Sequence, residues 1–126
     1  MKKIISTPHA PGAIGPYSQA VLAEGVLYTA GQIAIVPETG ELDLSNISAE
    51  THQVMKNLGA VLSAAEMDFS NVAKCTIFLK DMNQYAEINA VYAQYFLDNP
   101  PAREAVQVSR LPKDVNIEIS LIAVLS

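Results

Sequence analysis

The chain has 126 residues, half of them hydrophobic and 17% charged, with 13 acidic and 8 basic side chains and a net charge of −5. This length and composition are typical of one folded domain over residues 1–126. The acidic balance, without a lysine or arginine cluster, argues against nucleic-acid binding and against an anionic membrane surface.

Cysteine and histidine are too sparse for a cross-linked or zinc-bound scaffold. Cys75 is the single cysteine, and His9 and His52 lie far apart in the sequence. No apolar run could span a bilayer, and the N-terminal residues lack the apolar stretch of a secretory signal. We therefore expect a cytoplasmic protein with no metal site.

The N-terminal part of the chain predicts a loop followed by two strands. Turn-forming residues dominate positions 8–16. Val21-Leu22 and residues 26–36 are predicted as strands, joined by a tight turn at Glu24-Gly25 and closed by a turn at 37–40. Residues 2–5 are a candidate for a further short strand.

The rest of the chain alternates predicted helices and strands. Ser48 is expected to cap a helix with Glu50 in its first turn, and the apolar stripe of that helix is Val54, Leu58, Val61, Leu62 and Ala65. Residues 72–79 form a strand, and Asp81 or Asn83 opens a second helix that Pro100-Pro101 ends. Its stripe is Tyr85, Ile88, Val91, Tyr92, Tyr95 and Phe96. Strands at 102–108 and 116–125, separated by a turn at 111–114, complete an α+β fold.

The two helices cover one face of the predicted sheet, because strand-helix-strand crossovers are right-handed. Yet several strands are apolar on both faces, among them those at 72–79 and 116–125. In the strand 72–79, Ala73, Cys75, Ile77 and Leu79 alternate with Val72, Thr76 and Phe78. Another copy of the chain is the economical cover for the second face, so we expect a homo-oligomer with a site at the subunit boundary.

Arg103 and Glu118 are the leading candidates for chemistry. Arg103 shares a strand face with Ala105 and Gln107, which leaves its guanidinium room to grip a carboxylate with two N–H bonds. Glu118 is the only acid in the last apolar strand. Arg103 is its candidate partner, one strand away, and would lower the pKa of Glu118 so that the carboxylate orients a water. The alternative for both residues is an ordinary surface position.

Other polar or reactive residues have weaker patterns. Tyr17 follows a rigid Gly15-Pro16 turn and is more typical of packing than of catalysis. Gly31 within a strand often marks close approach of a ligand or backbone. Cys75 in an apolar strand is typical of a buried, inert thiol. Motifs for nucleotide binding and for nucleophilic catalysis are absent, and we expect no cofactor.

Four segments of the chain resemble the RidA (YjgF) family. They are Ala10-Pro11-Gly12-Ala13-Ile14-Gly15-Pro16-Tyr17-Ser18-Gln19-Ala20, Tyr28-Thr29-Ala30-Gly31-Gln32-Ile33, Val91-Tyr92-Ala93-Gln94-Tyr95-Phe96, and residues 101–119 with Pro101-Ala102-Arg103-Glu104-Ala105-Val106 and Leu111-Pro112-Lys113-Asp114-Val115-Asn116-Ile117-Glu118-Ile119. The resemblance runs nearly end to end, in order and with the family's spacing.

The resemblance implies a chorismate-mutase-like mixed sheet backed by two helices, assembled as a homotrimer with clefts between subunits. It also implies cofactor-free hydrolysis of reactive enamines and imines, released by pyridoxal-phosphate-dependent threonine and serine dehydratases, to 2-keto acids and ammonia. By the same resemblance, Arg103 binds the substrate carboxylate and Glu118 positions the attacking water. Tyr17 closes the cleft from the neighbouring subunit, the Gly31 backbone lies against the ligand, and Asn89 assists.

Three positions depart from the pattern common in that family. Ala30 stands where many members have serine, Ala105 where many have cysteine, and Ala34 where many have proline. Ala30 and Ala105 belong to the expected substrate-binding set, so these departures bear on substrate preference more than on reaction class.

Two alternatives to the deaminase remain open. One is a ligand-sensing or regulatory module that binds keto acids without turnover, which the simplified Ala30 and Ala105 favour weakly. The other is a ribonuclease, against which the negative charge and the lack of a basic stripe argue.

Overall fold

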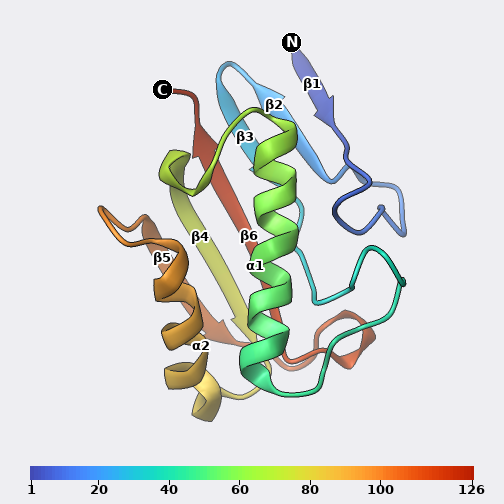
Figure 1. Cartoon of the computed structure of the whole chain (residues 1–126), viewed down its shortest axis with the longest axis vertical. Coiled ribbons are helices and arrows are strands. Elements are labelled where there is room, and N and C mark those ends of the chain that lie inside the picture. The colour runs from blue at the N-terminus through green and yellow to red at the C-terminus, as the bar shows by residue number, and fades with distance from the viewer.

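A computed structural model describes all residues 1–126 as one six-stranded sheet with two α-helices on one of its faces (Figure 1). The elements are β1 (Lys2–Ile5), β2 (Ala20–Ala23), β3 (Val26–Thr29), α1 (Ile47–Ala64), β4 (Val72–Leu79), α2 (Tyr85–Tyr92), β5 (Ala102–Gln107) and β6 (Ile117–Val124). The strand order is β1-β2-β3-β6-β4-β5. β4 and β5 run parallel, and every other neighbouring pair is antiparallel. The predicted α+β arrangement is therefore confirmed, including the short strand at residues 2–5.

Helix α1 packs its predicted stripe against the sheet. Val54, Leu58, Val61 and Leu62 are all fully buried. The helix begins at Ile47 because the Asn46 side chain accepts a hydrogen bond from the backbone N–H of Ala49 at 2.8 Å. The prediction that Ser48 caps this helix is wrong, since an N-cap side chain must precede the first helical turn that it closes.

Helix α2 lies beside α1 over β4 and β5 (Figure 1). Asp81 accepts from the N–H of Asn83 and caps a short 3₁₀ turn, Met82–Gln84, that leads into the helix. The predicted apolar stripe is largely confirmed: Ile88, Val91, Tyr92 and Phe96 are buried, and Tyr85 and Tyr95 are half-buried.

The predicted strand at 26–36 is too long. β3 ends at Thr29, and beyond it the chain keeps only single bridges, Gln32 to Ile119 and Ile35 to Leu42. The side-chain amide of Asn57 in α1 donates to the carbonyl oxygens of Ile33 at 3.0 Å and Ile35 at 2.9 Å. These two carbonyls are therefore satisfied by a helix side chain instead of a neighbouring strand.

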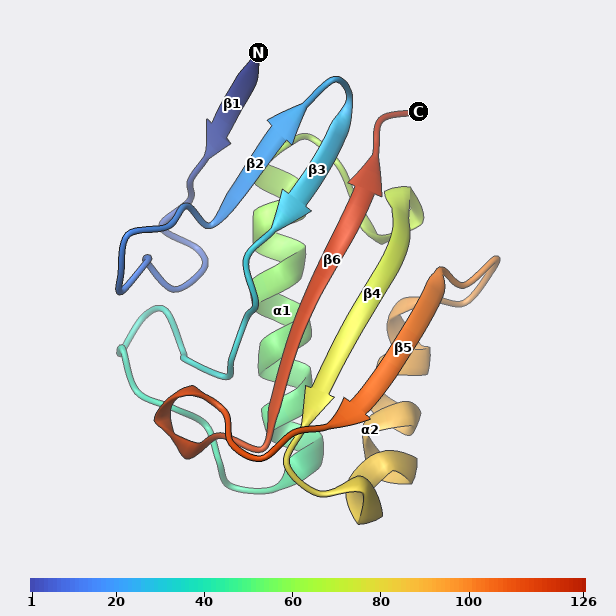
Figure 2. The same ribbon diagram turned by 180° about the vertical axis from the view of Figure 1, so that it is seen from behind.

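No helix covers the second face of the sheet (Figure 2). Phe78 and Ile122 are half-buried there, and Tyr28 and Val106 are about half exposed at 49% and 44%. A bulge between Val72 and Lys74 shifts the alternation at the start of β4, so Val72 joins the core and Ala73, expected inside, is exposed.

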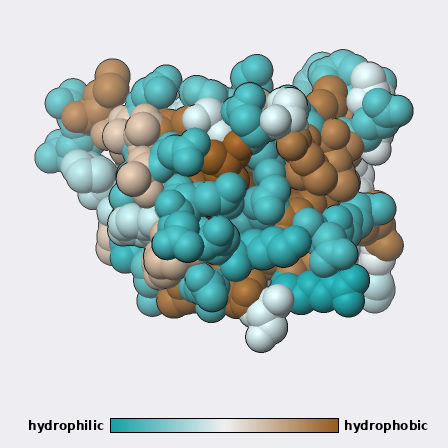
Figure 3. All heavy atoms as spheres, turned by 90° about the horizontal axis from the view of Figure 1, so that it is seen from below, coloured by the Kyte–Doolittle hydropathy of each residue, from teal (hydrophilic) through white to brown (hydrophobic).

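The end of the molecule where β4 stops and β6 begins is more hydrophilic than the open face of the sheet. Hydrophilic side chains cover most of it, and hydrophobic atoms form separate patches between them (Figure 3). Neither helix combines the length and the hydropathy that a membrane-spanning segment requires.

Glu50 is a fully buried carboxylate in the first turn of α1. Its two oxygens accept from the backbone N–H of Asn116 at 2.8 Å and from the Asn116 side-chain amide at 2.7 Å. Asn116 immediately precedes β6, so Glu50 fixes the point at which this central strand enters the sheet.

We predict that Glu50→Ala lowers the free energy of unfolding by about 3 kcal/mol, because it leaves two buried donors unpaired and opens a cavity. Urea unfolding at one fixed protein concentration measures the change. The matched control is Glu87→Ala in the first turn of α2, where the side chain is exposed and the expected change is within about 0.5 kcal/mol. Equal stability of the two variants would contradict this role of Glu50.

Candidate functional site

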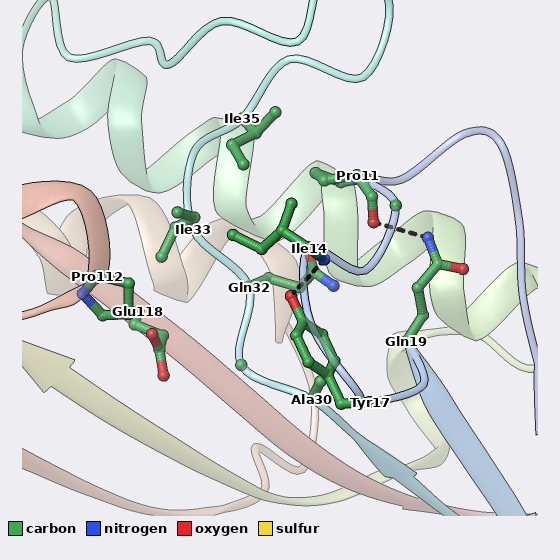
Figure 4. Close-up of a pocket in the computed structure, with 12 residues that line it drawn as sticks. Pro11, Ile14, Tyr17, Gln19, Ala30, Gln32, Ile33, Ile35, Pro112 and Glu118 are labelled. Atoms are coloured by element: carbon green, nitrogen blue, oxygen red, sulfur yellow. Dashed lines mark hydrogen bonds between the residues drawn. The ribbon is translucent and has the colours of Figure 1, made fainter.

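A pocket of about 330 Å³ lies beside β6. Its walls come from the N-terminal loop between Pro11 and Gln19, the segment from Ala30 to Ile35, Pro112, and Glu118 of β6 (Figure 4). The lining is mainly apolar, with a few polar side chains among isoleucines and prolines, as is usual for small-molecule sites.

Three buried polar side chains hold the walls of this pocket in place. Gln19 binds the N-terminal loop: its oxygen accepts from Thr7 N–H at 2.7 Å, and its amide nitrogen donates to the Pro11 carbonyl at 2.8 Å. Asn57 holds the segment that contains Ile33 and Ile35, and Glu50 holds the entry to β6.

The sequence patterns did not identify these three anchors as positioning residues. A signal exists for Asn57, which lies three residues after Val54 and four before Val61 and therefore within the buried face of the helix. A polar residue on such a face needs a partner inside the protein.

Glu118 is half-buried on the face of the sheet that the helices leave open, opposite Phe78 of β4. Burial raises the pKa of its carboxyl group above the ordinary value. Gly31 lies directly against this carboxylate, and a Cβ atom at that position would overlap the Glu118 side chain. A close approach does exist at Gly31, but the group that approaches is the Glu118 side chain and not the predicted ligand or backbone.

Tyr17 and Ala30 line the same pocket as Glu118. The Tyr17 hydroxyl accepts a hydrogen bond from the Ile14 N–H at 3.3 Å, and its ring is about half exposed (Figure 4). One chain therefore supplies both Tyr17 and Glu118 to the walls of this pocket. The expectation that Tyr17 closes a cleft between subunits stays a prediction, since it concerns a second copy of the chain.

Arg103 lies on β5, where its side chain points toward α2. Its guanidinium donates to the Asn89 side-chain oxygen at 2.7 Å and to the Tyr85 hydroxyl at 2.5 Å. It also lies over the rings of Tyr92 and Tyr85, with 4.9 and 5.4 Å from the guanidinium carbon to the ring centroids. None of the three ion pairs of the chain involves Arg103, so its charge has no carboxylate partner.

The structure does not bring Arg103 and Glu118 together. β4 separates β5 from β6, and Arg103 pairs with buried Cys75 on the helix side whereas Glu118 faces the open side. The predicted pairing is therefore wrong within one chain. Within one chain burial raises the Glu118 pKa, opposite to the predicted lowering, because no guanidinium lies near this carboxyl group.

The remaining candidates fall on the Arg103 side of the sheet. Asn89 holds the guanidinium, and Ala105 is half-buried two residues further along β5. Cys75 is fully buried, which raises its pKa and agrees with the prediction of an inert thiol. His52 binds the Tyr95 hydroxyl at 2.8 Å, and the chain holds no group of three or more metal-ligating side chains.

Comparison with known proteins identifies the family of this chain. The family model described as Endoribonuclease L-PSP matches residues 7–125. A RutC family protein of Pyrococcus horikoshii is 54% identical over 98% of both chains. The human 2-iminobutanoate/2-iminopropanoate deaminase is 48% identical over 98% of this chain and 90% of its own.

Solved structures agree with the sequence matches. E. coli TdcF with bound serine superposes with a TM-score of 0.95 at 43% identity, covering 98% of this chain and 99% of its own. The YjgF gene product of E. coli gives 0.94 at 42% identity with the same coverage. The chain belongs to the YjgF/RidA family.

We predict that Gly31→Ala displaces the Glu118 carboxylate, because the added methyl group needs the space that the carboxylate occupies. The overlap should lower the free energy of unfolding by about 1–3 kcal/mol, and a crystal structure of the variant should show the Glu118 side chain moved. Gly12→Ala is the matched control, since nothing lies within 4 Å of the position that its added Cβ would take. An unmoved Glu118 in the Gly31 variant would contradict the contact.

Proposed function

We propose that this protein hydrolyses 2-iminobutanoate, 2-iminopropanoate and their enamine forms to 2-keto acids and ammonia. The carrying observation is the half-buried Glu118 carboxylate at an apolar pocket, in a chain 48% identical to a named human 2-iminobutanoate/2-iminopropanoate deaminase. The imines come from pyridoxal-phosphate-dependent threonine and serine dehydratases in the cytoplasm.

Glu118 acts on the attacking water. Its carboxylate accepts a proton as the water oxygen bonds to the imine carbon and the C=N electron pair moves to nitrogen, which takes up a proton. The proton that nitrogen takes up comes from Glu118, whose carboxylate then transfers the hydroxyl proton of the adduct to nitrogen as well. The C–N bond breaks while a C=O bond forms, ammonia leaves, and Glu118 is again a carboxylate. Water and imino acid are thereby converted to keto acid and ammonia, and no cofactor enters the balance.

The pocket suits small apolar imino acids. Ala30 and Ile33 supply apolar walls for a methyl or ethyl group, and Tyr17 closes one side. An imine is already electrophilic, so holding it beside an oriented water in a sheltered cavity is sufficient catalysis.

Arg103 binds the substrate carboxylate from a neighbouring subunit of a homotrimer. Its guanidinium is pre-oriented by Asn89 and has no carboxylate partner, and β5 forms an edge of the sheet where a second copy can reach it. The solved structure of the relative TdcF carries serine, a ligand with the same carboxylate group. The exposed apolar side chains on the open face give the copies a surface to bury.

The acidic charge of the chain disfavours the ribonuclease that the family description names, because phosphate binding depends on a positive surface. A regulatory module would bind a keto acid in the same pocket without turnover, so a direct assay separates it from the enzyme.

The decisive assay couples the protein to a threonine dehydratase and traps released imine with semicarbazide. We expect the protein to lower the trapped product and to raise free 2-ketobutyrate. An unchanged partition, together with calorimetric binding of 2-ketobutyrate, would instead support the regulatory module.

We predict that Arg103→Ala and Glu118→Gln each lower kcat/KM by about 100-fold or more, from the loss of the carboxylate anchor and of the base. If the two residues meet across a subunit boundary, an equal, randomly assembled mixture of the two variants contains about a quarter of intact sites. Mixing should therefore restore about a quarter of the activity. Separately assembled trimers combined without exchange are the control, and no recovery in mixed trimers would contradict the shared site.

We predict that activity falls on the acid side with an apparent pKa above the ordinary glutamic-acid value of about 4.3, because burial raises the pKa of Glu118 and its protonated form cannot accept a proton from water. The measurement is kcat/KM between about pH 4 and pH 8, divided at each pH by the rate of uncatalysed imine hydrolysis. Glu87→Gln, at an exposed position, should keep the same profile. An acid limb at or below the ordinary value would show that burial does not dominate the Glu118 pKa in the assembled site.

A further inference from the structure

The groups that hold Arg103 are neutral. Its guanidinium donates to the Asn89 side-chain oxygen at 2.7 Å and to the Tyr85 hydroxyl at 2.5 Å, and its other N–H groups have no partner within the chain. Glu104, the next residue along β5, binds Lys74 at 3.0 Å. The charge of Arg103 is therefore fixed in position without being neutralised, and N–H donors are left for an anion.

The Tyr85 hydroxyl has a proton that these contacts leave unused. An arginine side chain only donates hydrogen bonds, so the hydroxyl oxygen is the acceptor in its bond with Arg103. The O–H of Tyr85 must then point away from the guanidinium, and no group of the chain accepts from it. A hydroxyl that accepts from a cation is polarised and becomes a stronger donor. Two donors with no acceptor of their own thus lie side by side.

Both donors lie at the edge of the sheet. Arg103 and Tyr85 are half-buried, so neither is enclosed in the core. They meet between α2 and β5, and β5 is an outermost strand (Figure 1). Tyr92, the other ring that the guanidinium lies over, differs because its hydroxyl oxygen is buried away from solvent. An anion that binds Arg103 at this edge is therefore within reach of the Tyr85 hydroxyl.

Resting on the proposed function, we propose that the Tyr85 hydroxyl donates a hydrogen bond to the substrate carboxylate that Arg103 binds. A carboxylate offers only acceptors and has two oxygens, so one oxygen can accept from the guanidinium and the other from the hydroxyl. The Tyr85 ring lies beside the guanidinium, with 5.4 Å from its centroid to the guanidinium carbon, and this contact keeps the two donors together. Tyr85 is then a second substrate-binding residue of the anion site.

The test removes this hydroxyl alone. Tyr85→Phe keeps the ring beside the guanidinium. Tyr95→Phe is the matched control, because the Tyr95 hydroxyl binds His52 instead of Arg103. In the threonine-dehydratase assay we expect Tyr85→Phe to lower kcat/KM by about 10-fold to 100-fold, the effect of one hydrogen bond to a charged group. The calorimetric dissociation constant of 2-ketobutyrate, which has the same carboxylate, should rise as well. Tyr95→Phe should match the unmodified chain in both measurements.

A crystal structure with bound 2-ketobutyrate separates a direct contact from support of Arg103. We expect the Tyr85 hydroxyl oxygen within hydrogen-bond distance of a carboxylate oxygen. In the Tyr85→Phe variant, we expect the guanidinium of Arg103 still to bind Asn89. A carboxylate that Arg103 binds without Tyr85, or a guanidinium displaced in the variant, would show a supporting role only and overturn the proposal.

Failure of this proposal and failure of the proposed function give different results. Full activity of Tyr85→Phe with unchanged 2-ketobutyrate binding would overturn the contact and leave the deaminase function intact. An unmodified chain that binds 2-ketobutyrate without hydrolysing imines would overturn the deaminase function. In that case weaker binding by Tyr85→Phe would still support the contact with the carboxylate, and equal binding would overturn it.

Discussion

The hydrogen bonds from buried polar side chains to loop backbone are the constraint on which the pocket depends. The Asn57 amide in α1 donates hydrogen bonds to the carbonyl oxygens of Ile33 and Ile35. The chain after β3 therefore leaves the sheet instead of continuing as a strand. Gln19 holds the N-terminal loop by four hydrogen bonds of its amide. Helix and sheet thereby place two loops and the start of β6 around one cavity.

The alternation of side chains along the strands divides the functional groups between two faces. Glu118 projects to the open face with the pocket, and Arg103 projects toward α2, where Asn89, Tyr85 and Tyr92 hold its guanidinium without neutralising it. In the proposed mechanism, a single chain therefore has the base Glu118 on one face and the anion anchor Arg103 on the other. This division gives a physical reason for the shared site that we propose, since only a second copy can bring the two groups to one substrate.

The elements could be predicted well because each depends on local periodicity. The stripe of α1 at Val54, Leu58, Val61 and Leu62 has the spacing of a helix with one buried face, and β4 matches its predicted bounds of 72–79. Errors fell where a distant group decided the outcome. The strand after Val26 was predicted too long because the effect of Asn57 is not visible near residue 30, and Glu50 was expected to be only a helix-terminus charge because Asn116 lies 66 residues away.

For the site, as for the fold, local sequence patterns predicted some features, and contacts between distant parts of the chain decided the others. The sequence alone determined the fold class, the family resemblance and the two buried helix faces, because periodicity and motif spacing are local properties of the chain. Tertiary structure decided that β4 lies between β5 and β6, that Arg103 and Glu118 face opposite sides, and that Gly31 touches the Glu118 carboxylate. It also decided that the buried Gln19 amide binds the backbone of the N-terminal loop. Strand order and burial result from packing the whole chain around one core, and no short stretch of sequence contains them.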